Sequence, residues 1–291
     1  MTLAQSGNPP RLQAEALKAD LYSRCRSHVL SRLSDVATDT SPFHHLFIDE
    51  IFPADFYASL HDHMVALKHG DSIEARTQDN PDFVTQRCNL FESTDDVASC
   101  IRAVFSDPGI KEALLEKFYV GPLQALAGSL SIHQEFEYTF TKAGRFQNVH
   151  VDIPPKFLSF VFYIPEHPVP PNAQKRNATI LYDKSLAPRY RARYLENSVC
   201  IFAPHFYSYH GFSSSIDREA LVMFCVNAGA LSAWQSIRRA QKEQPPFAEF
   251  LDGVERKLRA HPLKEYWGGE DRVISERAAC LVNAPQGRVL G

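Results

Sequence analysis

The feature that most constrains the fold of this 291-residue chain is a series of short strand-like segments after Gly128. Turn residues separate them and no helical pattern intervenes, which is typical of a sandwich or barrel and not of βαβ units. The segments are SLSIHQEFEYTF, FQNVHVD, KFLSFVFYIP, NATILYD, SVCIFAP, FYSYHGF and EALVMFCVN. With FHHLFIDEIF at residues 43–52 they supply the strands of a jelly roll, so we expect a mainly β (α+β) core with helical additions.

Segments with helical periodicity lie on both sides of the strand series. Residues 11–33 repeat apolar side chains at roughly helical spacing, and a second helix is expected between Pro53 and Gly70. The polar stretch 71–92 is expected to be a long loop or hairpin. We therefore predict three regions, namely an N-terminal helical region (1–42), a β core with helical insertions (43–228) and a C-terminal helical extension (229–291).

Charge and composition argue against several classes of partner. The chain carries 31 Lys and Arg against 34 Asp and Glu, so no bulk field favours nucleic acid or an anionic membrane. No apolar segment reaches the roughly 20 residues of a membrane helix, and the N-terminal residues lack the apolar stretch of a secretory signal. The cysteines are scattered without CxxC spacing. We therefore expect a soluble, reduced, cytoplasmic protein without nucleic-acid or membrane partners.

Three histidines stand two positions before an acid. The pairs are His69–Asp71, His133–Glu135 and His150–Asp152. The first lies where a helix ends, and the negative end of the helix dipole explains a His there. The second shares its strand face with Glu137 and Thr139, which indicates a solvated surface. Only the third has apolar neighbours around it, so its polar face must be hydrogen-bonded or bound to something.

The third pair is suited to hold a metal ion. His150 and Asp152 lie two apart on an expected strand, so both side chains point to the same face. A third ligand is expected from a later strand, where His205 follows an expected turn and His210 opens a strand. We favour His210, which Arg218 follows eight residues later. Two His and one carboxylate form the facial triad of non-haem Fe(II) oxygenases, and a buried polar network is the alternative.

This order of H-x-D, a distant His and then an Arg resembles the signature of Fe(II)/2-oxoglutarate-dependent dioxygenases. It is most similar to the prolyl-4-hydroxylase-like branch, over roughly residues 43–228. The resemblance implies a double-stranded β-helix, that is, a jelly roll, with His150, Asp152 and His210 as Fe(II) ligands. It also implies 2-oxoglutarate and O2 as cosubstrates, ascorbate as an optional reductant, and succinate and CO2 as co-products.

The resemblance further assigns residues to the cosubstrate. Arg218 would pair with the distal carboxylate of 2-oxoglutarate, because an Arg fork matches a carboxylate bidentately; a salt bridge to a neighbouring acid is the alternative. Tyr138 and Thr179 stand where such enzymes often place cosubstrate contacts, and ordinary core packing is the alternative for both. Lys156 stands where the family often has an Arg or Lys shortly after the H-x-D pair.

The substrate is less constrained by the sequence. Arg145 and Asn148 flank the expected metal strand, while Arg76 and Arg87 lie in the polar stretch, and all four are candidate substrate contacts. We predict hydroxylation of an unactivated C–H bond of a small molecule, such as an amino-acid derivative or a biosynthetic intermediate. A protein side-chain hydroxylase and a non-catalytic cupin-like metal-binding protein are the alternatives. The apolar faces of the helices after residue 229 form a hypothetical homodimer interface.

Overall fold

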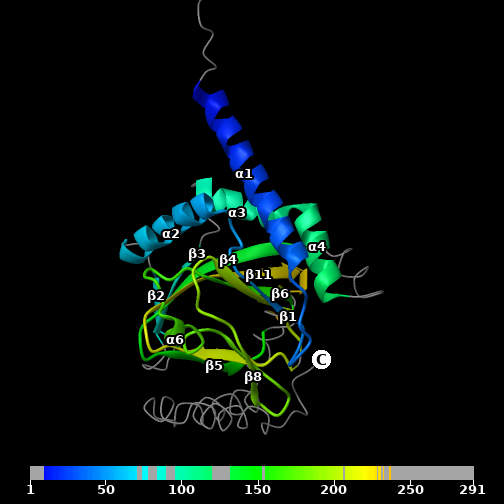
Figure 1. Ribbon diagram of the computed structural model, residues 1–291, viewed down its shortest axis with the longest axis vertical. Coiled ribbons are helices and arrows are strands. Elements are labelled where there is room, and N and C mark those ends of the chain that lie inside the picture. Colours follow the sequence, from blue (N-terminus) through cyan, green and yellow to red (C-terminus); the bar gives the residue numbers. More distant parts are fainter. Residues whose placement is uncertain are drawn as a thin grey trace, which may run out of the picture.

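The computed structural model describes residues 10–70, 74–77, 84–89, 96–119, 132–152, 155–205 and 207–227, together with residues 229, 230, 232 and 236. Within these residues the chain forms two antiparallel sheets and a layer of helices (Figure 1). The predicted combination of a mainly β core with helical additions is therefore confirmed. None of the described helices combines the length and apolar character that crossing a membrane requires.

The helices lie on the face of the larger sheet that is turned away from the smaller one (Figure 1). They are α1 (Pro10–Asp35), α2 (Ala54–His69), α3 (Asp96–Ser106) and α4 (Pro108–Phe118), with a short α6 (Pro171–Gln174) elsewhere. Helix α4 begins at a side-chain cap, since Asp107 Oδ1 accepts hydrogen bonds from the backbone N–H groups of Gly109 and Ile110. Pro108 follows at the first helical position, where no backbone donor is needed.

The larger sheet has seven strands in the order β1-β9-β6-β11-β4-β3-β2. In that order they are His45–Ile48, Ser198–Phe202, Lys156–Tyr163, Arg218–Asn227, Ile132–Thr141, Val84–Asn89 and Glu74–Thr77. Strands β11 and β4 form the longest pairing, which runs from Arg218 opposite Thr141 to Asn227 opposite Ile132. Strands β2 and β3 pair with each other, so the polar stretch adds a hairpin-like edge to the sheet.

The smaller sheet has four strands in the order β5-β10-β7-β8. They are β5 (Phe146–His150), β10 (His210–Ser213), β7 (Ile180–Tyr182) and β8 (Pro188–Arg191), of which β8 was not predicted. The chain passes from β4 to β5 through a turn at Gly144, whose φ of +81° favours glycine. The antiparallel register then sets His210 opposite His150.

The main hydrophobic core lies between the helices and the larger sheet. Alternate residues of the sheet point into it, among them Phe136, Leu158 and Met223. Smaller apolar clusters lie around the second sheet. The C-terminal helices expected after residue 229 fall almost entirely outside the described residues, and so does the hypothetical homodimer interface.

Candidate functional site

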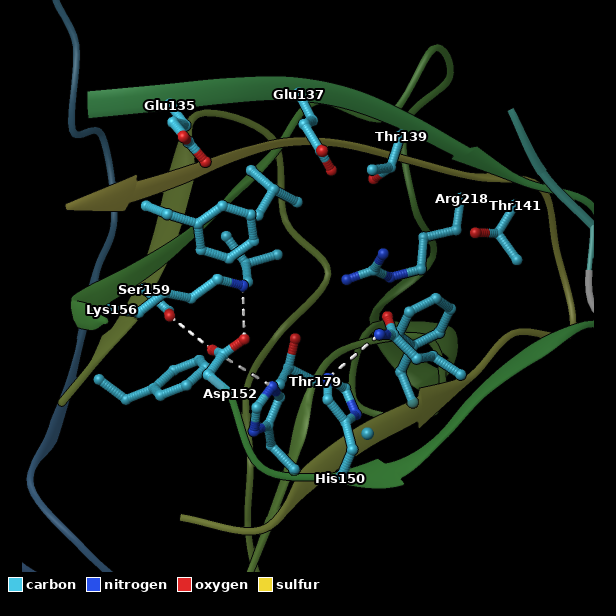
Figure 2. A pocket seen from close by; sticks show the side chains of 18 residues that line it. Glu135, Glu137, Thr139, Thr141, His150, Asp152, Lys156, Ser159, Thr179 and Arg218 are labelled. Carbon is cyan, nitrogen blue, oxygen red and sulfur yellow. Dashed lines mark hydrogen bonds and ion pairs between the residues drawn. The ribbon is translucent and has the colours of Figure 1, made fainter. Parts of the chain in front are cut away.

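A cavity of about 220 Å³ lies between the two sheets. One wall comes from β4, β6 and β11 of the larger sheet, and the other includes β5 and β10 of the smaller sheet (Figure 2). Both polar and apolar side chains line it. The three predicted metal ligands and the predicted cosubstrate arginine are among the residues that line it.

His150, Asp152 and His210 each bring one potential ligand atom to within 4.8 Å of the others. The imidazole rings have centroids 4.2 Å apart, and His210 Nε2 lies 3.8 Å from Asp152 Oδ2. His150 ends β5 and His210 begins β10, so the strand register brings together residues that are far apart in sequence. These donors have the composition of a facial triad for Fe(II).

His210 is held in the form that a metal requires. Its Nδ1 lies 2.9 Å from the Ser208 carbonyl oxygen, so an Nδ1–H donates there and Nε2 remains as the free electron-pair donor. Burial, followed by the nearby His150, lowers the pKa of His210 to about 3. The ring is therefore neutral at physiological pH, as metal binding demands.

Asp152 is held ionised in the same site. Lys156 Nζ donates to Oδ1 at 2.7 Å and Ser159 Oγ donates to Oδ2 at 2.6 Å. Burial raises the pKa of the Asp152 carboxyl, but the Lys156 ammonium, followed by the neighbouring imidazoles of His210 and His150, lowers it more, and the net pKa lies well below its usual range. The site therefore combines a carboxylate with neutral imidazole.

Arg218 reaches the other end of the cavity from the first residue of β11. The residue is 2% exposed, its Nε donates to the Asn177 carbonyl at 3.1 Å, and its guanidinium carbon lies 3.9 Å from the Phe212 ring centroid. Neither Asp217 nor Glu219 pairs with it, which excludes the salt bridge considered from the sequence. Among the described residues its terminal nitrogens have no acceptor, and Figure 2 shows them directed into the cavity.

Threonines adjoin this guanidinium. Thr141 lies opposite Arg218 in the β4–β11 register, and its Oγ1 is buried without a hydrogen-bond partner in the described structure. Thr179 also lines the cavity, and its Oγ1 accepts a hydrogen bond from Tyr163 OH at 2.8 Å. A buried, unsatisfied hydroxyl beside a buried cation fits a carboxylate such as that of 2-oxoglutarate.

Tyr138 does not lie in this cavity, which corrects the expectation of a cosubstrate contact. It belongs to the core between the larger sheet and the helices. The physical reason is strand alternation, since the neighbouring Thr139 faces the cavity and Tyr138 must face the opposite side. Burial raises the pKa of the Tyr138 hydroxyl well above its usual value.

The same alternation brings two unpredicted residues to the site. Glu135 and Glu137 line the cavity beside Thr139, although the sequence indicated a solvated face (Figure 2). The pattern separated the two faces of β4 correctly. It could not show that the smaller sheet, and not bulk water, lies opposite the polar face.

The residues predicted to contact the substrate do not line the cavity, or have side chains that the structure does not describe. The Arg145 backbone closes the β4–β5 turn by donating to the Lys142 carbonyl at 3.1 Å, and Arg145 does not line the cavity. The side chains of Arg76, Arg87 and Asn148 fall outside the described ones.

His205 also lies away from the triad. Its ring packs edge-on against Phe43 at 5.5 Å, and its Nδ1 accepts a hydrogen bond from the Tyr207 backbone N–H. The structure therefore places His210 with the other two predicted ligands, and not His205.

Of the comparisons with known proteins, the one with solved structures gave matches. No family model matches the sequence, and no curated protein matches it. A prolyl-4-hydroxylase from Pseudomonas putida matches with a TM-score of 0.53 and 12% identity, over 68% of this chain and 98% of that one. Prolyl 4-hydroxylase from Phytophthora capsici gives a TM-score of 0.52 and 13% identity, over 92% of this chain and 90% of that one.

A prolyl hydroxylase from Trichoplax adhaerens, solved with a peptide fragment of the hypoxia inducible factor oxygen degradation domain, matches similarly. Its TM-score is 0.52 at 12% identity, over 79% of this chain and 99% of that one. This chain has the fold of the prolyl hydroxylases. At such identities the likeness concerns the backbone, so the chemistry has to be argued from the side chains in the cavity.

Proposed function

We propose that this protein is an Fe(II)/2-oxoglutarate-dependent oxygenase that hydroxylates a C–H bond of a small molecule on a double-stranded β-helix core. The main support is that one cavity contains two complementary groups. His150, Asp152 and His210 form a potential metal site, and Arg218 is a buried cation directed into the same space. A protein that only bound metal would have no need for the second group.

Each polar residue then has a defined task. The imidazoles of His150 and His210, which bind a metal in their neutral form, and the carboxylate of Asp152 would hold Fe(II). Arg218 and Thr141 would bind the distal carboxylate of 2-oxoglutarate through charge-assisted hydrogen bonds. When bound, Fe(II) with 2-oxoglutarate and O2 supplies the oxidising chemistry, with succinate, CO2 and the hydroxylated substrate as products.

Apolar side chains also line the cavity. Val161 and Val222 are paired across β6 and β11 and both line it, as do Phe202 and Phe212. Such walls exclude water, which strengthens the electrostatic contacts inside and protects reactive species from side reactions.

A small substrate is compatible with the volume of the site. About 220 Å³ must accommodate the cosubstrate as well as the group that reacts. A protein side chain is the second candidate, supported by the peptide bound to the Trichoplax neighbour. Turnover assays that compare a metabolite extract with a peptide library would distinguish the two, because the true substrate accelerates succinate formation.

The central test is the release of succinate from 2-oxoglutarate in the presence of Fe(II), O2 and ascorbate. We expect the wild-type protein to release it and Arg218→Gln to raise the KM for 2-oxoglutarate by about 100-fold, because a buried charge partner is lost. Arg189→Gln is the matched control, since Arg189 is an exposed arginine that pairs with Asp183. No release from iron-loaded wild-type protein would contradict the proposed function.

A further inference from the structure

Lys156 occupies an unusual position for a lysine. It is the first residue of β6, and its ammonium enters the cavity beside Asp152 (Figure 2). Its side chain is only 15% exposed, with Nζ 2.7 Å from Asp152 Oδ1. The same Nζ lies 3.2 Å from the centroid of the Phe224 ring. Two contacts therefore hold the ammonium in place.

The two oxygens of Asp152 face different partners. Oδ1 accepts the hydrogen bond from Lys156, whereas Oδ2 accepts one from Ser159 and lies 3.8 Å from His210 Nε2. Oδ2 is thus the oxygen turned toward the other potential ligands. A metal held there leaves the pair between Lys156 and Oδ1 intact.

Lys156 changes the net charge of the residues around the potential metal site. Asp152 contributes one negative charge and Lys156 one positive charge, so the pair is neutral. Without Lys156 the same ligands would carry one negative charge. A divalent cation is attracted more weakly by the neutral set, and the loaded site keeps more positive charge to attract an anionic cosubstrate.

Building on the proposed function, we infer that Lys156 is the counter-ion of Asp152 and balances the affinities of the site for its two charged ligands. It fixes the carboxylate with Oδ2 toward the histidines, weakens binding of the metal and strengthens binding of dianionic 2-oxoglutarate. Lys156 is therefore a positioning residue that acts through Asp152. Its removal should change the two affinities in opposite directions, which a purely structural role would not do.

The test measures two dissociation constants on the full chain. Co(II) is titrated into metal-free protein, and 2-oxoglutarate is then titrated into Co(II)-loaded protein without O2. For Lys156→Met, which keeps an unbranched chain of similar length against Phe224, we expect the Kd for Co(II) to fall by about tenfold and that for 2-oxoglutarate to rise by about tenfold. Lys156→Gln, a second neutral variant, should show the same signs.

Two controls separate charge from packing. Lys156→Arg keeps the charge and should give values near those of the wild type, and Lys142→Met removes an exposed lysine whose partner is Asp217. Weaker or unchanged Co(II) binding in both neutral variants would overturn the inference while leaving the proposed function standing. If wild-type protein fails to bind Co(II), or binds it equally well after His210→Ala, the triad itself is wrong and both proposals fall.

Discussion

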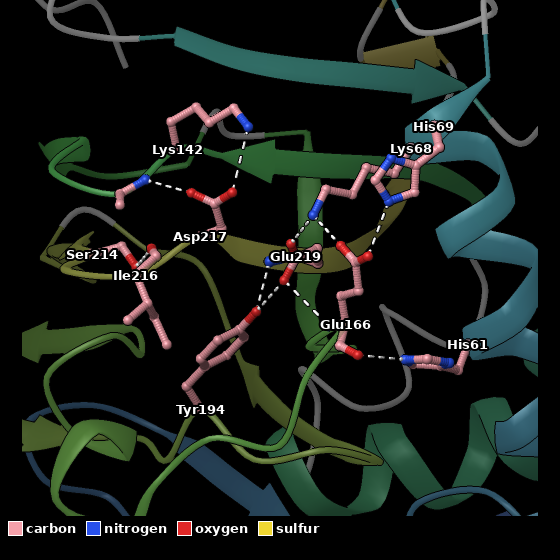
Figure 3. Close-up of polar contacts among 11 residues, drawn as sticks. His61, Lys68, His69, Lys142, Glu166, Tyr194, Ser214, Ile216, Asp217 and Glu219 are labelled. Atoms are coloured by element: carbon pink, nitrogen blue, oxygen red, sulfur yellow. Dashed lines mark hydrogen bonds and ion pairs between the residues drawn. The ribbon is translucent and has the colours of Figure 1, made fainter.

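Two adjacent residues of β11, Arg218 and Glu219, belong to polar clusters of opposite character. Glu219 is buried in a closed cluster with Lys68, Glu166 and Tyr194 (Figure 3). Lys68 contacts both carboxylates, with Nζ 2.8 Å from Glu219 Oε1. The Tyr194 hydroxyl donates to Glu219 Oε2 and accepts from the Glu219 backbone N–H, both at 2.7 Å. Every charged side chain here has a protein partner.

The cavity cluster around Arg218 is open by comparison. Among the described residues, the terminal nitrogens of Arg218 lack an acceptor and Thr141 Oγ1 lacks any partner. Buried polar groups are normally satisfied, and a buried charge is normally paired. The closed cluster therefore joins α2 to the sheet, whereas the open one has polar groups left over for the ligand proposed above. Substitutions should consequently cost stability in the first and binding in the second.

The largest effect is expected for His210→Ala. Loss of one of three ligands should abolish binding of Fe(II) or Co(II) and all succinate release, because two donors do not make a facial triad. Metal titration and the succinate assay measure both. His205→Ala is the matched control and should bind metal normally, since His205 lies outside the triad. Metal binding that survives His210→Ala but not His205→Ala would reverse this assignment.

In the closed cluster, Lys68→Ala should destabilise the protein strongly. It leaves the carboxylates of Glu166 and Glu219 without their cation, and breaking such a buried pair costs about 3–5 kcal/mol. Chemical denaturation measures the free energy of unfolding.

Lys142→Ala provides the comparison, because Lys68 and Lys142 both lie over the Phe140 ring, at 4.3 and 4.5 Å. Lys142, however, pairs with an exposed Asp217, so its loss should cost less than about 1 kcal/mol. Equal losses for the two variants would show that the ring contact matters and the ion pairs do not.

Acid should weaken the closed cluster over a defined range. Hydrogen bonds from Lys68 and His69 lower the pKa of Glu166 to about 2, from an ordinary value of 4.5. A lowered pKa in the folded state means that the carboxylate stabilises the protein above pH 4.5, and that this contribution disappears as the pH falls toward 2. Glu166→Gln should therefore be less stable than wild type at pH 7 and equally stable near pH 2. A difference that stays constant with pH would contradict the ion-pair role.

The smallest effect is expected for Thr141→Val. The substitution removes an unpartnered hydroxyl, so stability should hardly change, while the Kd for 2-oxoglutarate should rise by about threefold to tenfold. Thr139→Val is the counterpart on the same strand face. Its hydroxyl donates to the Ala220 carbonyl at 3.1 Å, so this variant should lose about 1 kcal/mol of stability. Thermal unfolding and cosubstrate titration of both variants would show whether the open and satisfied hydroxyls differ.

Local patterns predicted the elements well and the surroundings of those elements poorly. The predicted strands and the first two helices are present, because alternation, turn residues and terminal Pro and Gly act over a few positions. The His150–Asp152 pair and its distant partner His210 were also found from spacing. Strand β8 was missed, since PRYR is only four residues long, begins with Pro and contains no β-branched residue.

The sequence alone determined which side chains share a strand face, because the period of two is a property of the backbone. Only the tertiary structure decided what each face meets. On β4 the helices cover the side of Tyr138, and the smaller sheet closes a cavity over Glu135, Glu137 and Thr139. The ion pair of Lys156 with Asp152 and the approach of Thr141 to Arg218 were decided in the same way. Such contacts depend on how whole layers pack, and no local pattern encodes that packing.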